Sequence, residues 1–360
     1  MRSEIQKDLK TLRILVIADS KIAIPPQGYG GAERIIGSLC DGLARRGHHV
    51  SLMAAKGSKN YGRLITYRWS GDKGFIQRCF IKLSHFVLSL RELFLGHDAI
   101  IACCRPDYLT PFLYAGVPLL YRFDNPINQD DVEHILRRAR GPLSLVAVSN
   151  KQRQEFAIDR MQTIYNGVDL KQFNYSKFAG EYLAFLGRLT FNKGVDSAIR
   201  VARRTGLPLK IAGNISDEPG GREFFEREVA PHLRGNIEWI GEIDDRSKSA
   251  FLADAIALLA PIRWEEPFGI VVPEALACGT PVIAISRGSM PELIQDGVTG
   301  FLVSNEDEMI EALEHIHEID RSKCRQNVEH RFASDDMLEK HMAILQALVA
   351  EKHAARLTKS

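Results

Sequence analysis

The sequence is short of the features that set a protein apart from ordinary globular chains. No uncharged apolar run approaches the roughly 18–20 residues that cross a bilayer, and the polar start MRSEIQKDLK does not form a secretory signal. A formal net charge of +2 gives no reason to expect nucleic acid as a partner. The six cysteines contain no CxxC spacing, which favours buried thiols over a metal site. We therefore expect a cytoplasmic protein in a reducing compartment.

What the sequence does contain is a regular alternation of short apolar runs and amphipathic segments, the pattern of βα units. Because 360 residues exceed the usual size of one hydrophobic core, two domains are expected. The expected strands are Leu12–Ala18, His49–Ala54, Ala99–Ala102, Pro118–Tyr121, Leu143–Val148, Tyr182–Leu186, Leu209–Ala212, Ile237–Ile240, Ile256–Leu259, Pro281–Ala284 and Gly300–Val303. The expected helices include Ala32–Arg46, Val195–Thr205, Phe224–Leu233, Asp245–Ala253 and Glu306–Ile316.

This pattern predicts an α/β protein of two doubly wound, Rossmann-like domains. The first domain covers residues 1–172 and the second 173–336, with the boundary in the polar stretch Asp169–Glu181. The last segment, Met337–Lys352 within a helix of about 337–360, is expected to pack back on the first domain. Ligands of such sheets bind beyond the carboxyl ends of the strands, so two facing domains place the site in a cleft between them.

The most specific pattern lies in the stretch PIRWEEPFGIVVPEALACGTPVIAISRGSMPELIQDGVTGF. We expect a helix that begins at Ile270 with Gly269 as its cap. Pro273 is tolerated there, because the first four N–H groups of a helix have no partner within it. The backbone N–H groups at such a helix start, together with its dipole, favour an anion. This arrangement suits the diphosphate of a nucleotide-sugar.

Two carboxylates flank this expected diphosphate position. Glu266 precedes the helix and Glu274 lies a little over one turn inside it, eight positions later. Carboxylates accept hydrogen bonds from hydroxyls, so Glu266 is assigned to the donor sugar and Glu274 to the ribose. Taken alone, Glu274 also fits a solvated acid that complements the helix dipole.

Two further segments point toward the same cleft. In FLGRLTFNKG, Arg188 directly follows a strand and Lys193 precedes a helix, so both cations are expected at the phosphates. In PPQGYGGAERII, Gly30 and Gly31 precede a helix of the first domain and permit close backbone approach to a ligand. Each motif alone also fits a plain alternative: surface cations in the first case and an ordinary turn in the second.

Together these residues resemble the retaining glycosyltransferases of sequence family 4 (group 1), which have the two-domain GT-B fold. The resemblance covers nearly the whole chain: GGAERIIGSLCDGLARRGHHVSLMAA, VAVSNKQRQEF with IYNGVDLKQF, FLGRLTFNKG, and above all EPFGIVVPEALACGTPVIA with GSMPELIQDGVTGFLV, which matches the EX7E signature.

The resemblance implies a role for each matching position. Arg188 and Lys193 would neutralise the departing diphosphate, Glu266 would contact the donor sugar, and Glu274 would bind the ribose. The remaining donor-binding positions are Gly30 and Gly31 from the first domain, Gly241 and Glu242 at the nucleotide base, and the backbone of Phe268, Gly269 and Ile270.

One position departs from the family pattern. Many members carry a histidine just after the strand that matches Pro118–Tyr121, near the reacting sugar, whereas this segment reads LLYRFDNP. Asp124 or Asn125 stands in its place, and we carry the catalytic role over to Asp124. An aspartate that caps the next turn explains the residue equally well.

The resemblance implies transfer of a hexose-type sugar, with retention, from a UDP- or GDP-sugar to a hydroxyl of a saccharide or lipid-linked saccharide. Such reactions serve cell-surface polysaccharide, lipopolysaccharide or glycoconjugate synthesis. No cofactor and no metal are expected, because protein cations do the work and no DxD-like pair lies beside the phosphate motif. A sugar-nucleotide epimerase and a glycosidic phosphorylase of the same fold remain as alternatives. A glycoside hydrolase gives Arg188 and Lys193 no purpose, and GYGGAE lacks the spacing of a nicotinamide dehydrogenase.

The segment from Arg63 to Arg91 contains six basic residues against one acid, Asp72, with aromatic and aliphatic residues between them. A basic amphipathic segment of this kind suits peripheral contact with an anionic membrane, which would place the protein at the inner face of the cell membrane. An ordinary domain helix with a buried apolar side is the competing interpretation.

Overall fold

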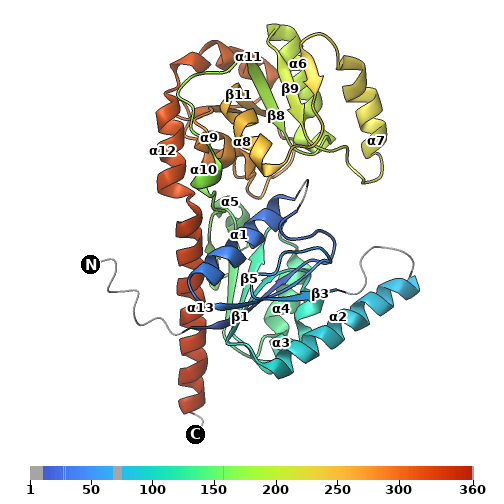
Figure 1. The fold of residues 1–360 in the computed structure, drawn as a ribbon, viewed down its shortest axis with the longest axis vertical. Helices are drawn as coiled ribbons and strands as arrows, with labels where there is room; N and C mark the ends of the chain where they lie inside the picture. Colours follow the sequence, from blue (N-terminus) through green and yellow to red (C-terminus); the bar gives the residue numbers. More distant parts are fainter. Residues whose placement is uncertain (1–10, 27, 29, 68–74, 157, 359–360) are drawn as a thin grey trace.

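The computed structural model describes residues 11–26, 28, 30–67, 75–156 and 158–358, without the side chains of 75–79. Within this part of the chain, two parallel sheets of seven and six strands form two lobes, each with helices packed on its sheet (Figure 1). The predicted pair of doubly wound α/β domains is thus confirmed.

In the first lobe the strand order is β3-β2-β1-β4-β5-β6-β7. Its strands are β1 (Arg13–Ala18), β2 (His49–Ala54), β3 (Arg63–Thr66), β4 (Ala99–Cys103), β5 (Leu119–Phe123), β6 (Leu143–Ala147) and β7 (Met161–Thr163). Its helices are α1 (Gly31–Arg45), α2 (Phe75–Leu95), α3 (Thr110–Ala115), α4 (Gln129–Arg138) and α5 (Asn150–Gln154). The central strands are apolar on both faces because helices cover both sides.

In the second lobe the strand order is β10-β9-β8-β11-β12-β13. Its strands are β8 (Tyr182–Leu186), β9 (Leu209–Ala212), β10 (Ile237–Trp239), β11 (Ala255–Ala260), β12 (Val282–Ile285) and β13 (Gly300–Val303). Its helices are α6 (Val195–Thr205), α7 (Gly221–Phe224), α8 (Asp245–Ala253), α9 (Val271–Ala277), α10 (Met290–Leu293), α11 (Glu306–Glu314) and α12 (Arg321–Arg331).

The chain passes between the lobes twice. It leaves the first sheet after Thr163 and enters the second at Tyr182, and it returns through α13 (Ser334–Leu357). Figure 1 shows α13 running from the second lobe along the side of the first. There it packs against α1, and Leu338 and Leu345 belong to the same core as the β1 side chains.

Several elements differ from the sequence prediction. The short edge strands β3 and β7 were not predicted, because four and three residues carry too little alternation to register. The predicted helix Phe224–Leu233 is helical but not regular: a π-helix at Phe225–Val229 and a 3-10 helix at Ala230–His232 follow α7. Pro231 lacks an N–H and clashes with the preceding turn, so a regular helix does not continue through it.

Candidate active site

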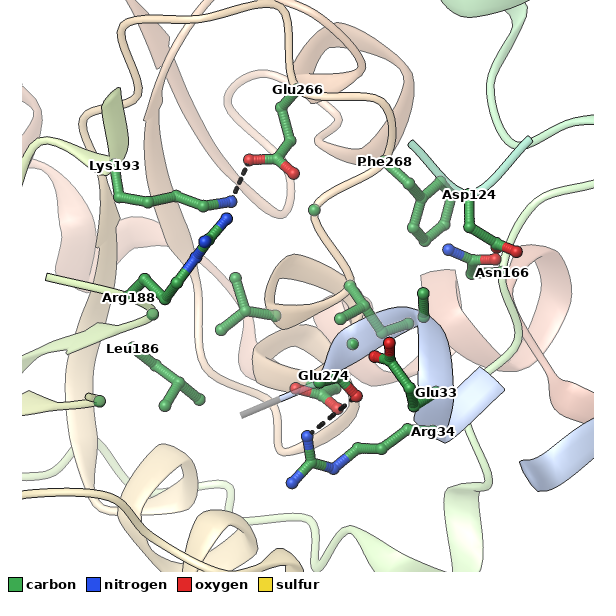
Figure 2. A pocket seen from close by; sticks show the side chains of 18 of the residues that line it. Glu33, Arg34, Asp124, Asn166, Leu186, Arg188, Lys193, Glu266, Phe268 and Glu274 are labelled. Carbon is green, nitrogen blue, oxygen red and sulfur yellow. Dashed lines mark hydrogen bonds and ion pairs between the residues drawn. The ribbon is translucent and has the colours of Figure 1, made fainter. Parts of the chain in front are cut away.

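A cavity of about 360 Å³ lies between the two lobes and is lined by both of them. Its polar side chains follow the carboxyl ends of strands, where doubly wound sheets place their ligands. Asp124 follows β5, Arg188 follows β8 and Glu242 follows β10. Figure 2 shows the Asp124 and Arg188 side chains at the cavity.

Lys193 and Glu266 form an ion pair on the second-lobe wall of this cavity (Figure 2). Trp264 Nε1 donates to the same Glu266 oxygen at 2.8 Å, and its ring lies 5.1 Å from Lys193 Nζ. The backbone of Glu266 is also fixed, since its carbonyl accepts from Ser289 N at 3.0 Å. Glu266 therefore presents a held carboxylate to the cavity, with its cation already in place.

Arg188 lines the same wall, and Figure 2 shows its guanidinium directed toward the Lys193 ammonium. Its NH1 group contacts Glu218 Oε1 at 2.7 Å, and the Glu218 side chain is mostly exposed. The two cations predicted for the phosphates thus meet at one place. The carboxylates of Glu218 and Glu266 compensate the positive charges of these two side chains.

Glu274 lies on α9 and pairs with Lys248 of α8 at 2.7 Å. Both side chains are almost fully buried. Lys248 Nζ also lies 3.4 Å from Asp245, whose carboxylate accepts from Arg34 Nε of the first lobe at 2.6 Å. Sequence reasoning missed Lys248, because a lone lysine in the polar run DDRSKSA carries no signal of burial. It is nevertheless the cation that holds the carboxylate assigned to the ribose.

The first-lobe wall is formed by the start of α1. Gly30 has φ 151°, which favours glycine, and a Cβ on Gly31 would lie 3.3 Å from Ile270 Cγ2 of the second lobe. Both glycines line the cavity, together with Glu33. Burial raises the pKa of the Glu33 carboxyl, and the charges of Asp124 and Asp19 raise it further.

Asp124 lies on the same wall, directly after β5. Its Oδ1 accepts from Arg122 Nε at 2.8 Å, and Arg122 is fully buried. Asn125 and Asn166 line the cavity beside it. Asp124 does not cap the following helix α4, whose cap is Asn128. The competing capping interpretation is therefore wrong for α4.

The loop before α9 brings Phe268, Gly269 and Ile270 to the cavity. Helix α9 begins at Val271, one residue later than predicted, and Ile270 rather than Gly269 is its cap. Gly269 has φ 75°, and a Cβ there would lie 2.7 Å from Met290 Cε. Ile270 packs against the cores of both lobes, so this loop forms part of the contact between them.

The two residues predicted to contact the nucleotide base, Gly241 and Glu242, differ in their positions. Glu242 lines the cavity, whereas Gly241 is not among the lining residues. Gly241 has φ 77° and its carbonyl accepts from Gly213 N at 2.8 Å. Gly241 therefore contributes to the conformation of the loop that carries Glu242, and does not itself line the cavity.

The described residues contain no group of three or more His, Cys, Asp or Glu side chains that could hold a metal ion. The expectation of a reaction without metal stays a prediction.

Comparisons with known proteins divide the chain at the same place as the two lobes. Residues 29–172 match the family model of Glycosyltransferase Family 4, and residues 171–331 match that of glycosyl transferases group 1. An uncharacterised glycosyltransferase of Methanocaldococcus jannaschii is 24% identical over 332 residues, which cover 78% of this chain and 82% of that protein.

An uncharacterised 41.2 kDa protein in the cps region of Klebsiella pneumoniae is 28% identical over 206 residues. That match spans 52% of this chain and 56% of the relative's own length. Among solved structures, Anabaena HepE in complex with UDP-glucose superposes with a TM-score of 0.74 over 94% of this chain and 100% of that chain, at 17% identity. That likeness shows the GT-B fold.

Proposed function

Because the chain belongs to the family 4 (group 1) glycosyltransferases, we propose that it moves a hexose-type sugar from a nucleotide-sugar donor to an acceptor hydroxyl. The donor is a UDP- or GDP-sugar, and the acceptor is a saccharide or a lipid-linked saccharide. The transfer retains the anomeric configuration and needs no metal ion. The observation that carries this proposal is the meeting of Arg188, Lys193 and Glu266 on one wall of the cavity between the lobes.

The leaving diphosphate is the group that the two cations suit. When the bond between the sugar C1 and the phosphate oxygen breaks, its electron pair stays on the diphosphate while C1 becomes oxocarbenium-like. Arg188 and Lys193 are already oriented for that growing negative charge, and preorganised charges of this kind are usually the largest catalytic contribution. The acceptor oxygen then bonds to C1, and its proton passes to the departing phosphate.

The carboxylates bind the two sugars of the donor. Glu266 accepts from hydroxyls of the transferred hexose, and its second oxygen keeps the contact with Lys193 and Trp264. Glu274 accepts from the ribose hydroxyls, with Lys248 holding it in place. Anabaena HepE, which shares this fold, has been solved with UDP-glucose, and this supports a donor of that chemical class.

A panel of sugar nucleotides tests the proposal. A donor present at 100 times its dissociation constant adds about 2.7 kcal/mol to the folded state, which a thermal shift detects. We expect one UDP- or GDP-sugar to stabilise the protein and to yield nucleoside diphosphate only when an acceptor is added. If no sugar nucleotide raises the melting temperature, the proposal is wrong. Isomerisation of the donor alone would indicate an epimerase, and dependence on inorganic phosphate a phosphorylase.

The surface of α2 is the basis for a proposal about where in the cell the protein acts. No helix among the described residues is long and apolar enough to cross a membrane. Yet α2 exposes one apolar stripe, whose members are spaced three, four and seven residues apart: Phe80, Leu83, Val87 and Phe94, with Phe86 and Leu95 beside them. Phe94 is 89% exposed.

The opposite face of α2 carries polar side chains, and this face is the buried one. Arg63 donates to the fully buried Glu92 at 2.7 and 2.8 Å, and Ser89 Oγ donates to the Tyr108 carbonyl at 2.9 Å. His85 lies between the rings of Tyr67 and Tyr108. Leu88 and Leu93 of α2 also pack against the first-lobe core. The helix thus turns both polar and apolar side chains to the protein, and it leaves the apolar stripe exposed to solvent.

The predicted basic segment is only partly one helix. Arg63 begins the strand β3 and pairs with Glu92, so it lies outside α2. Arg68, Trp69, Asp72 and Lys73 lie outside the described residues, as do the side chains of 75–79. Glu92 is the single acid in the sequence of α2, and it is buried, whereas Lys82 and Arg91 are exposed.

We propose that the exposed α2 stripe docks on an anionic lipid surface, where cations beside apolar side chains are favoured. Figure 1 shows α2 at the outer edge of the first lobe, away from the second.

The test is co-sedimentation with phosphatidylcholine vesicles, with and without phosphatidylglycerol. Replacing Phe80 and Phe94 by Ser should weaken binding by about tenfold or more. Phe178→Ser, an equally exposed phenylalanine elsewhere, is the control. Absence of binding to either vesicle, or dimerisation through α2 instead, would refute the membrane proposal.

A further inference from the structure

Arg122 is the largest of the fully buried side chains among the described residues, and it lies on β5, two positions before the cavity residue Asp124. A buried charge is tolerated only when its donors are satisfied. Nε donates to Asp124 Oδ1 at 2.8 Å, NH1 contacts His341 Nε2 at 3.2 Å, and NH2 donates to Asn166 Oδ1. Each nitrogen of the guanidinium is therefore engaged, in three different directions.

His341 comes from α13 and is completely buried. Its Nδ1 lies 2.7 Å from the Met337 carbonyl, which only accepts, so the ring proton is on Nδ1. Nε2 is consequently the acceptor for Arg122. Burial, together with the Arg122 charge, lowers the pKa of His341 to about 3, so the ring stays neutral at ordinary pH. His341 thus fixes the orientation of the Arg122 guanidinium.

The fixed guanidinium in turn fixes Asp124. Oδ1 is occupied by Arg122, while Oδ2 is buried and has no hydrogen-bond partner among the described residues. The Asp124 side chain is 7% exposed, yet it lines the cavity. Figure 2 shows it beside Asn166 and Phe268. A buried polar atom without a partner costs free energy, so this oxygen calls for a donor from a bound molecule.

We propose that Arg122 and His341 are positioning residues, which hold Asp124 so that its second oxygen accepts a hydrogen bond from one hydroxyl of the transferred sugar. This inference rests on the proposed function. It makes the C-terminal helix α13 part of the site's support, although His341 does not line the cavity. It also defines specificity: the position selects a donor sugar that carries a hydroxyl there.

The test compares an accepted donor with its monodeoxy analogues. For the wild-type protein, kcat/KM for one analogue should be at least about tenfold lower than for the full donor. That analogue lacks the hydroxyl that donates to Asp124, so Asp124 is left unpaired. Asp124→Asn and His341→Leu should lower kcat for the full donor and shrink that analogue-specific penalty. His341→Gln, which keeps an acceptor for Arg122, should restore most of the activity. A purely structural role for His341 changes no analogue-specific penalty.

Leu345→Ala is the matched control, because Leu345 is buried on α13 in the first-lobe core and its side chain has no group that could accept a hydrogen bond from Arg122. It should lower the melting temperature and leave the analogue penalty at the wild-type value. Should His341→Leu not fold, Asp124→Asn and Arg122→Lys carry the test. An unchanged penalty in Asp124→Asn, or an equal change in Leu345→Ala, would overturn the inference. Failure of the wild type to transfer sugar from any donor contradicts the proposed function itself.

Discussion

Lys248 Nζ lies 2.7 Å from Glu274 Oε1, and each of the two side chains is 7% exposed. The carboxylate assigned to the ribose is therefore one half of a buried ion pair between α8 and α9. Removing one partner of such a pair leaves the other charge buried and uncompensated, which is far more costly than losing an exposed pair. The pair thus has a structural role in addition to the proposed binding role.

The first prediction concerns the structural role of this pair. Lys248→Met should destabilise the folded state by about 3 kcal/mol, because Glu274 remains as an isolated buried charge. The double variant Lys248→Met, Glu274→Gln should recover at least half of that loss. Urea unfolding measures both. Equal stability of the single and double variants would show that the two residues are not coupled.

The second prediction concerns the two cations at the proposed phosphate position. Arg188→Ala should fold normally, because its partner Glu218 is mostly exposed and such pairs contribute little. Its sugar transfer should be at least about tenfold slower, since one preorganised charge is lost. Initial rates with saturating donor provide the measurement, and Lys177→Ala at an exposed site is the control.

Lys193→Ala should slow transfer to a similar extent but should also reduce stability. The side chain of its partner Glu266 is 10% exposed, and after the change Trp264 is its one remaining donor among the described residues. Full activity in both the Arg188 and the Lys193 variants would remove the proposed mechanism.

The third prediction is that transfer survives EDTA. In the proposed mechanism, Arg188 and Lys193 supply the positive charge that a metal ion supplies in metal-dependent enzymes. Dialysis against EDTA should leave the initial rate within about twofold of the untreated protein. Loss of activity that is restored only by a divalent ion would contradict this expectation.

Much of the fold follows from local sequence, because each βα unit has a clear apolar strand and an amphipathic helix. The main polar residues on the second-lobe wall of the cavity could also be predicted. These residues lie in short motifs whose backbone geometry is local: Arg188, Lys193, Glu266 and Glu274. The ion-pair partners of these residues could not be predicted, because Lys248 reaches Glu274 through the packing of α8 on α9.

The support of Asp124 lies still further from sequence reasoning. Arg122 and His341 are 219 positions apart and meet only because α13 returns from the second lobe to the first. Similarly, the exposure of the apolar stripe of α2 is invisible in the sequence, because periodicity alone does not tell which side of a helix is buried. Tertiary packing decided these features.

The last prediction tests the neutral state of His341 through pH. Its pKa falls from the ordinary 6.5 to about 3 in the folded protein, chiefly through burial. Above pH 6.5 the ring is neutral in both the folded and the unfolded chain, so it adds no pH dependence. As the pH falls below 6.5 the unfolded chain takes up a proton that the folded protein refuses, so stability decreases toward pH 3. His341→Gln has no such group, and its melting temperature should fall less than that of the wild type between pH 7 and pH 4. The other histidines titrate equally in both proteins, so the difference between the two curves belongs to His341. Parallel curves would mean that His341 is protonated in the folded state, and Arg122 would then have no acceptor on α13.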